Sequence, residues 1–198
     1  MAYNYNKNAI TMDKTIKELA KLFRTMVANR NDNEMWRNIP LGKQAFALML
    51  SLPDVVPGEI ESPAEKAQLL ANMLEQLLET DTPRFCISVR EEIACLNPDD
   101  ADNQESLTML REYIDLSIPA DEWGNRHHRY LKFDPVERTS EWEECIYDVE
   151  REVSQQLKGE PRHMGFCFSY WSAKTAVLTR YGITWRSPRI MNPRVIFD

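Results

Sequence analysis

The sequence is poor in glycine, and its few glycines are scattered. Only 6 of the 198 residues are glycine, and no two of them are closer than six positions. A phosphate-binding loop needs clustered glycines, because its backbone amides must approach the phosphate closely. Neither G-x-G-x-x-G nor the P-loop pattern is present. This scarcity counts against the commonest nucleotide-binding designs.

Paired cysteines and long apolar runs are also missing. None of the four cysteines forms a C-x-x-C pair of the kind that zinc and redox sites use. The longest apolar run, near 45–50, is far shorter than the roughly 18 residues of a membrane span. Residues 1–6 contain no apolar segment of a secretory signal. We therefore expect reduced thiols in a bacterial cytoplasm, no membrane contact and no cofactor.

Negative charge exceeds positive charge in this chain, and the two are unevenly distributed along it. The chain is acidic, with a net charge of −7, which divides into +4 over 1–52, −16 over 53–160 and +5 over 161–198. Two interpretations stay open. The basic ends pair with the acidic middle across the surface, or one of these faces meets a charged partner.

The spacing of apolar residues is mostly helical and predicts a mainly α fold of about six helices. Ser62-Pro63-Ala64-Glu65 and Ser140-Glu141-Trp142-Glu143 have the pattern of a capping box, which marks a helix start. One short β element is the alternative at 85–89 or 130–133, since periodicity does not decide for such short runs. Helices are expected at 12–28 with Thr11 as cap, 41–52, 63–80, 82–96, 104–116, 140–157 and 166–181.

We expect a single domain over 1–198, with 1–10 flexible and 183–198 forming a C-terminal clasp. The tail contains large apolar side chains that rarely stay in water, namely Ile183, Trp185, Ile196 and Phe197. Gly182 would allow the chain to reverse after the last helix. Composition thus favours a tail that packs back on the core.

The C-terminal block resembles a known group of sequences. It contains Tyr170-Trp171-Ser172-Ala173-Lys174, Tyr181-Gly182-Ile183 and Met191-Asn192-Pro193, and it ends Phe197-Asp198. In these motifs it is similar to the C-terminus of uncharacterised proteins from gut Bacteroidota and their phages or mobile elements. The resemblance covers about a sixth of the chain and implies a bacterial or phage setting, with no activity attached.

Three histidines and one cysteine are the candidate catalytic residues. His127 and His128 lie in a polar loop, and together with Asp121 they form the alternative metal set. His163 and Cys167 are four residues apart, as a thiolate–imidazole pair on one helix face would be. Adjacent histidines on an extended segment point to opposite sides, and a catalytic pair needs an orienting third group, so structural roles are favoured for all four.

The helix expected at 140–157 carries many acids, which could bind a metal or act as acid and base. Its apolar stripe predicts that most of them face solvent. The acids are Glu141, Glu143, Glu144, Asp148, Glu150 and Glu152.

The C-terminal segment combines cations with aromatic residues, which is typical of surfaces that bind single-stranded nucleic acid or a charged partner. The same aromatic residues also suit a small core, and that interpretation is favoured. The candidate contact residues are Arg162, Lys174, Arg180, Trp185, Arg186, Arg189 and Arg194.

We interpret the sequence as that of a non-enzymatic intracellular binding or accessory protein with a protein partner, encoded by a bacterium or its phage. It contains no complete catalytic constellation, phosphate loop or metal spacing. One alternative is nucleic-acid engagement, either directly through the C-terminus or by an acidic middle that imitates nucleic-acid charge. The other is a metal-dependent hydrolase.

Overall fold

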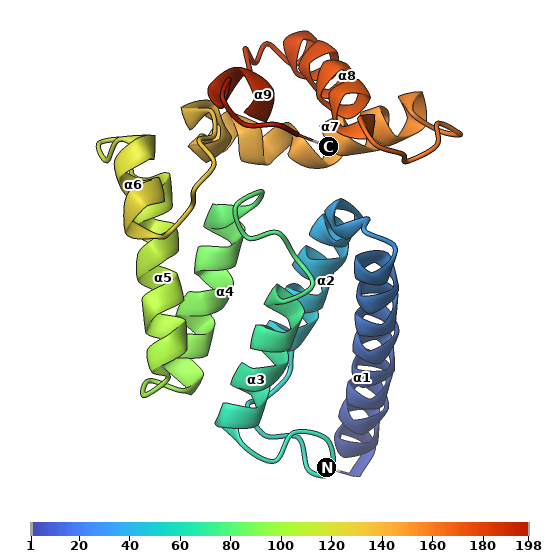
Figure 1. Cartoon of the computed structure of the whole chain (residues 1–198). Coiled ribbons are helices and arrows are strands. Elements are labelled where there is room, and N and C mark those ends of the chain that lie inside the picture. The colour runs from blue at the N-terminus through green and yellow to red at the C-terminus, as the bar shows by residue number, and fades with distance from the viewer. Residues whose placement is uncertain (1, 198) are drawn as a thin grey trace. The chain divides into compact units, whose positions relative to one another are not determined.

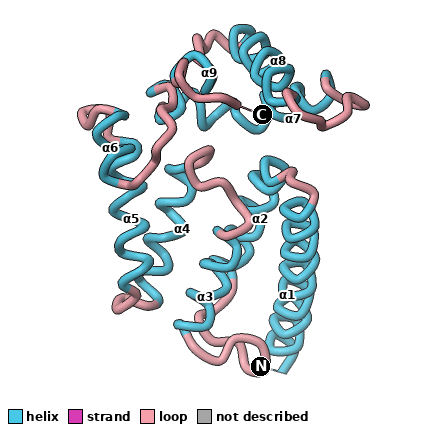
Figure 2. The backbone as a smooth tube through the Cα atoms, in the orientation of Figure 1, coloured by secondary structure: helices cyan, strands magenta, loops and turns pink. Residues whose placement is uncertain are grey.

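The computed structural model describes residues 2–197, with side chains from Met12 onward, and it is mainly helical (Figures 1 and 2). This confirms the predicted fold class. The described elements are α1 (Ala2–Asn31), η1 (Met35–Arg37), α2 (Asn38–Ser51), α3 (Pro63–Leu74), α4 (Pro83–Leu96), α5 (Ala101–Ile114), α6 (Ala120–Arg126), η2 (Pro135–Arg138), α7 (Ser140–Gln156), α8 (Phe166–Arg180) and α9 (Pro188–Met191).

No strand occurs between residues 2 and 197; there is only an isolated bridge between Val56 and Ile60. Both proposed β segments are therefore wrong. Residues 85–89 lie inside α4, where Cys86 and Val89 are buried three positions apart, at helical spacing. Residues 130–133 are irregular, without a neighbouring strand to pair with.

The chain divides into two compact units. Unit 1 consists of Met1–Glu79 and Phe85–Leu107, and unit 2 of Thr80–Arg84 and Thr108–Asp198. Helix α4 therefore begins in unit 2 and continues in unit 1, and α5 passes from unit 1 into unit 2. The single domain expected from the sequence stays a prediction.

In unit 1, α1 packs on α2, and α2 packs on α3 (Figure 1). Helix α1 begins at Ala2, ten residues before the predicted start, so residue 11 lies inside the helix and does not cap it. No proline or glycine precedes Met12 to end the helix earlier. The buried side chain of Asn38 donates hydrogen bonds to the carbonyls of Met26 (2.9 Å) and Gln76 (2.8 Å), which ties α1, α2 and the turn after α3 together.

The predicted start of α3 is confirmed. Ser62 is the cap, and its hydroxyl accepts a hydrogen bond from the Glu65 amide. The Glu65 carboxylate accepts from the amide of Glu61, one residue earlier than a capping box requires. The helix ends at Leu74 rather than near residue 80, so Leu78, which the helical stripe placed inside, is 50% exposed.

Replacing Leu74, which is 2% exposed, with alanine should lower the free energy of unfolding by about 2–5 kcal/mol through lost burial and a residual cavity. The half-exposed Leu78→Ala serves as the matched control and should cost much less. Urea unfolding measures both variants. Equal losses for the two variants would contradict the assignment of the core face of α3.

In unit 2, α7 packs against α8 and η2. Its predicted inward stripe is confirmed, since each member is buried: Trp142, Cys145, Ile146, Val149 and Val153. The helix starts at Ser140, but the cap is Thr139, whose hydroxyl accepts from the Trp142 amide. Helix α6 was not predicted, because its seven residues are too few to show an apolar period.

A buried arginine closes the end of α5 in unit 2. Arg138 is 1% exposed, and its guanidinium donates to the carbonyls of Glu112 (3.1 Å), Tyr113, Asp115 and Ile118 (2.7 Å). The last carbonyls of a helix have no partner within the helix, and they carry partial negative charge. Arg138 therefore supplies both the missing hydrogen-bond donors and a favourable charge.

The C-terminal tail packs on unit 2 with only part of its apolar residues. Ile183 and Trp185 are buried, as expected, and Gly182 adopts φ +79° where the chain turns after α8. Ile196, which was expected inside, is 89% exposed, and Ile190 is 63% exposed. The tail thus both closes the core and presents apolar side chains to solvent.

Candidate functional site

A buried ion pair lies between α7 and α8. Lys174 donates to Glu150 Oε1 at 2.6 Å, and the hydroxyl of Tyr170 donates to the same oxygen at 2.6 Å. Both charged side chains are about nine-tenths buried. Burial opposes the charge on Lys174, but Tyr170 and Glu150 together hold its pKa above the ordinary value. Lys174 therefore keeps its positive charge inside the protein, where its hydrogen bond to Glu150 fixes it in place.

Three aromatic rings surround the Lys174 ammonium. It lies 4.9 Å from the ring centre of Trp142, 5.5 Å from that of Trp185 and 5.6 Å from that of Tyr170. A cation is attracted to the negative face of an aromatic ring, most strongly where both are desolvated. Because Trp185 belongs to the tail, this cage couples the C-terminal segment to α7 and α8.

Lys174→Met should destabilise the protein by about 3–5 kcal/mol, because it leaves Glu150 buried without its counter-charge. The double variant K174M/E150Q should lose markedly less, since no bare charge remains. Urea unfolding followed by tryptophan fluorescence measures each change.

A surface ion pair provides the control for this experiment. Arg180 pairs with Glu152 at the exposed end of α8, and R180A/E152A should cost at most about 1 kcal/mol. A loss in K174M no larger than in this control would show that the buried pair contributes little.

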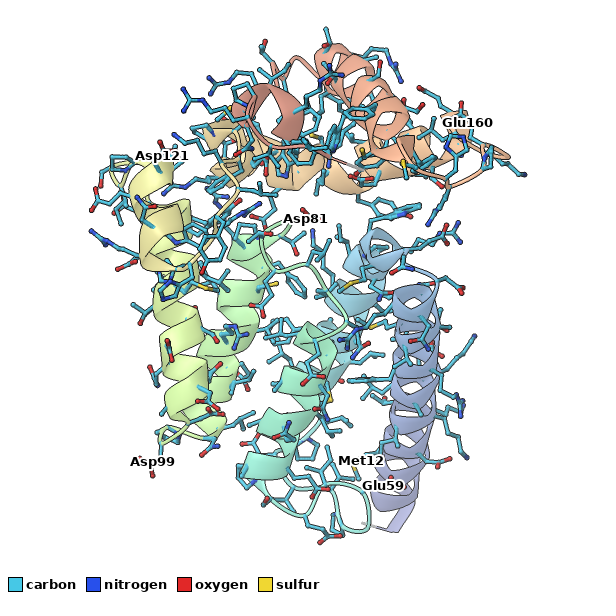
Figure 3. All side chains as sticks on the ribbon, viewed as in Figure 1. Met12, Glu59, Asp81, Asp99, Asp121 and Glu160 are labelled. Atoms are coloured by element: carbon cyan, nitrogen blue, oxygen red, sulfur yellow. The ribbon has the colours of Figure 1, made fainter. Side chains whose placement is uncertain are left out.

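Asp81 is a carboxyl group whose ionisation is influenced by the charges of this cluster. It lies in the loop before α4 (Figure 3), in the segment of unit 2 that comes from Thr80–Arg84. Burial raises its pKa to about 6, Lys174 opposes the rise, and the negative charges of Glu150 and Glu137 add to it. Ionisation of Asp81 therefore lowers the free energy of unfolding.

Asp81→Asn should raise the melting temperature at about pH 8 and have little effect at about pH 4. The pKa of Asp81 is higher in the folded than in the unfolded chain, so this group favours folding at low pH. That contribution disappears as the pH rises through about 6. The gain at high pH is about 1–3 kcal/mol after allowance for partial solvent screening.

The exposed Asp99 offers a matched control for the pH series, since D99N changes the same charge on the surface of unit 1. Thermal melts of the three proteins at both pH values make the comparison. If D81N raises the melting temperature equally at both pH values, ionisation of Asp81 does not destabilise the folded protein.

The tail is fastened by polar contacts to the chain between α6 and η2. The side-chain amide of Asn192 donates to the carbonyl of Lys132 at 2.8 Å and accepts from its amide at 2.9 Å. Arg186 donates from its backbone (2.8 Å) and its guanidinium (3.0 Å) to Asp134. Burial tends to raise the pKa of Asp134, but these hydrogen bonds hold it below the ordinary value.

These contacts create what we call the loop–tail face, the exposed side chains of residues 127–132 and 186–197. The two segments are distant in sequence, yet the Asn192–Lys132 bonds hold them side by side. Tyr130 is 92% exposed, and Ile190 and Ile196 are also exposed. Arg189 and Arg194 are exposed as well, and the guanidinium of Arg189 lies 5.0 Å from the ring centre of Phe168.

The structure places the catalytic candidates in separate environments. His127 Nε2 lies 3.0 Å from Glu112 Oε2, and this contact lowers the pKa of Glu112. His128 is exposed in a turn with φ +54°. His163 is exposed beside the carbonyl of Met164, and Cys167 is half-buried near the start of α8. Their catalytic use stays a hypothesis.

The alternative metal set is not assembled. Asp121, on the exposed side of α6 (Figure 3), pairs with Lys132, and His127 contacts Glu112. Among the side chains that the structure describes, no three His, Cys, Asp or Glu residues form a group that could hold a metal ion. Most acids of α7 are exposed or half-exposed, and Glu150 is the buried exception.

The predicted C-terminal contact residues fall into two groups. Lys174 and Trp185 are buried, Lys174 against Glu150 and Trp185 against Glu137, and their use as contact residues stays a prediction. The other members are exposed, two of them in ion pairs with Glu152 and Asp134: Arg162, Arg180, Arg186, Arg189 and Arg194. Sequence reasoning missed Tyr130, because nothing local distinguishes an exposed tyrosine from a packed one.

The four cysteines are free thiols, and Cys86 and Cys145 are buried. None of the described helices combines the length and the apolar character needed to cross a bilayer. Comparison with protein-family models, with curated proteins and with solved structures found no match. The resemblance of the C-terminal block therefore stays a prediction.

Proposed function

We propose that the protein is a binding or accessory protein without catalytic activity of its own, and that it engages its partner through the loop–tail face. The observation that carries this proposal is the exposure of Tyr130, Ile190 and Ile196 on a scaffold held by hydrogen bonds. A contiguous patch of exposed apolar side chains commonly marks an interaction site, and we infer that these three residues form one. Arg189 and Arg194 add positive charge around them.

The environment of the titratable candidates supports a non-catalytic role. His127 contacts Glu112, and Lys174 contacts Glu150 inside the aromatic cage. These groups are engaged in holding elements of unit 2 together. The His127 and Lys174 side chains therefore have structural contacts. The exposed apolar residues are on the loop–tail face.

The setting of this function also belongs to the proposal. The resemblance of the C-terminal block supports action inside a bacterial cell. The same resemblance supports an origin in a bacterium or in its phages or mobile elements. The four free thiols are compatible with a reducing compartment.

Photo-cross-linking tests whether the loop–tail face is a contact surface. A benzophenone amino acid replaces Tyr130 or Ile190 in the full-length protein, which is then irradiated in extract from the cells that express it. We expect adducts from both positions and none from Leu50, which is 51% exposed on unit 1. No adduct, or an equal yield at Leu50, would refute the proposed surface.

A further inference from the structure

A small cavity lies beside the exposed ring of Tyr130. Its volume is about 150 Å³, and it is lined by Asp121 and Asn125 from α6 and by Arg129, Tyr130 and Lys132 from the following loop. All of these residues belong to unit 2. The cavity thus shares Tyr130 and Lys132 with the loop–tail face, and Asn192 of the tail binds the backbone of Lys132.

Backbone contacts between α6 and the following loop give this cavity its shape. The amide of Arg129 donates to the carbonyl of Gly124 at 2.8 Å, which folds the loop back on α6. A Cβ at position 124 would lie 3.3 Å from the Arg129 carbonyl oxygen, so glycine allows this close approach. His128 turns the chain with φ +54°, and the Arg129 guanidinium lies 4.3 Å from the ring centre of Phe133. The loop is therefore a fixed wall.

The groups around the cavity suit a nucleotide. Tyr130 offers a planar ring that is 92% exposed, on which a base can stack. Asn125 is exposed and has both a donor and an acceptor for the edge of a base. Lys132 places a cation at the rim, where it pairs with Asp121 at 2.5 Å and can exchange this partner for a phosphate.

The distribution of charge favours a strand over a free nucleotide. The Asn192–Lys132 bonds bring the tail beside the cavity, and the tail carries the exposed cations Arg189 and Arg194. A strand has a phosphate at each nucleotide and can meet several cations in succession, which a single nucleotide cannot do. The exposed ring also needs an unpaired base, since bases within a duplex are stacked on each other.

We propose that the loop–tail face binds single-stranded nucleic acid, with one base stacked on Tyr130 at the cavity and neighbouring phosphates near Lys132, Arg189 and Arg194. This inference rests on the proposed function, because it names the partner class of the same surface. The exposed Ile190 and Ile196 then flank the path of the strand.

Fluorescence anisotropy with a labelled oligo-dT of about 12 nucleotides, within the usual site sizes, tests the proposal on the full-length protein. We expect binding that weakens between about 50 and 200 mM salt, with a slope of about 2 in log Kd against log salt for three phosphate contacts. Tyr130→Ala should weaken binding about tenfold, through the loss of one stacked base. Arg194→Ala should reduce the slope by about 0.7.

Matched controls are Met164→Ala, an 81% exposed apolar residue, and Lys158→Ala, an exposed cation, both in unit 2 and outside the loop–tail face. Neither should change the affinity as Tyr130→Ala or Arg194→Ala does. No binding at about 50 mM salt, equal binding of a duplex of the same length, or full affinity of Tyr130→Ala would each overturn the inference. Tighter binding of thymidine monophosphate than of the oligonucleotide would also overturn it, in favour of a free nucleotide.

The cross-linking experiment separates this inference from the proposed function. Adducts at Tyr130 that disappear with nuclease support both. Adducts that resist nuclease and yield peptides of a second protein by mass spectrometry identify a protein partner, which refutes the nucleic-acid inference and leaves the binding surface in place. The absence of adducts, together with failure of the oligonucleotide to bind, refutes both.

Discussion

The arrangement of unit 2 depends on one buried cation. The Arg138 guanidinium, which is 1% exposed, donates to four carbonyl groups at and just beyond the end of α5. Burial lowers the pKa of Arg138, but an arginine keeps its charge under any physiological condition. The end of α5 is thereby joined to η2, on which Arg138 lies.

Hydrogen bonds also connect η2 and its cap to the C-terminal tail. Asp134 caps η2 through the Val136 amide and also accepts from Arg186. Glu137, three residues later, accepts a hydrogen bond from the indole of Trp185 at 2.9 Å. One short helical turn therefore connects the core of unit 2 to the residues that hold the tail. Lys174 of α8 also contacts the tail, because its ammonium lies against the rings of Trp142 and Trp185.

The local features of this chain could be read from its sequence, and the long-range ones could not. The stripe Trp142, Cys145, Val149 shows its helical period within a few residues, and Ser62 shows its cap in the same way. In contrast, Asn192 and Lys132 are 60 positions apart, and an asparagine gives no sign of which backbone it will bind. Long-range contacts of this kind determine which exposed residues share a surface.

The two groups of C-terminal residues illustrate the same limit. Lys174 and Arg189 are both cations of the basic, aromatic C-terminal segment. Lys174 lies on the side of α8 that faces Glu150 of α7. Arg189 comes after the turn at Gly182 and is exposed. A basic and aromatic segment therefore contains both core and surface, and the sequence alone does not separate them. Tyr130 was overlooked for a related reason, because tyrosine is intermediate in burial and its neighbours in the sequence do not show whether it is exposed.

The amide of Asn192 acts toward Lys132 as a neighbouring strand would, since it satisfies one backbone donor and one backbone acceptor. Because both bonds are made to the main chain, they are indifferent to the side chains at positions 129–131. The exposed side chains of Tyr130 and Leu131 can therefore be exchanged while the bonds to Asn192 are kept, as antibody loops vary on a constant framework, whereas Arg129 also packs on the Phe133 ring. Related chains that retain Asn192 could present different chemistry from one inherited platform.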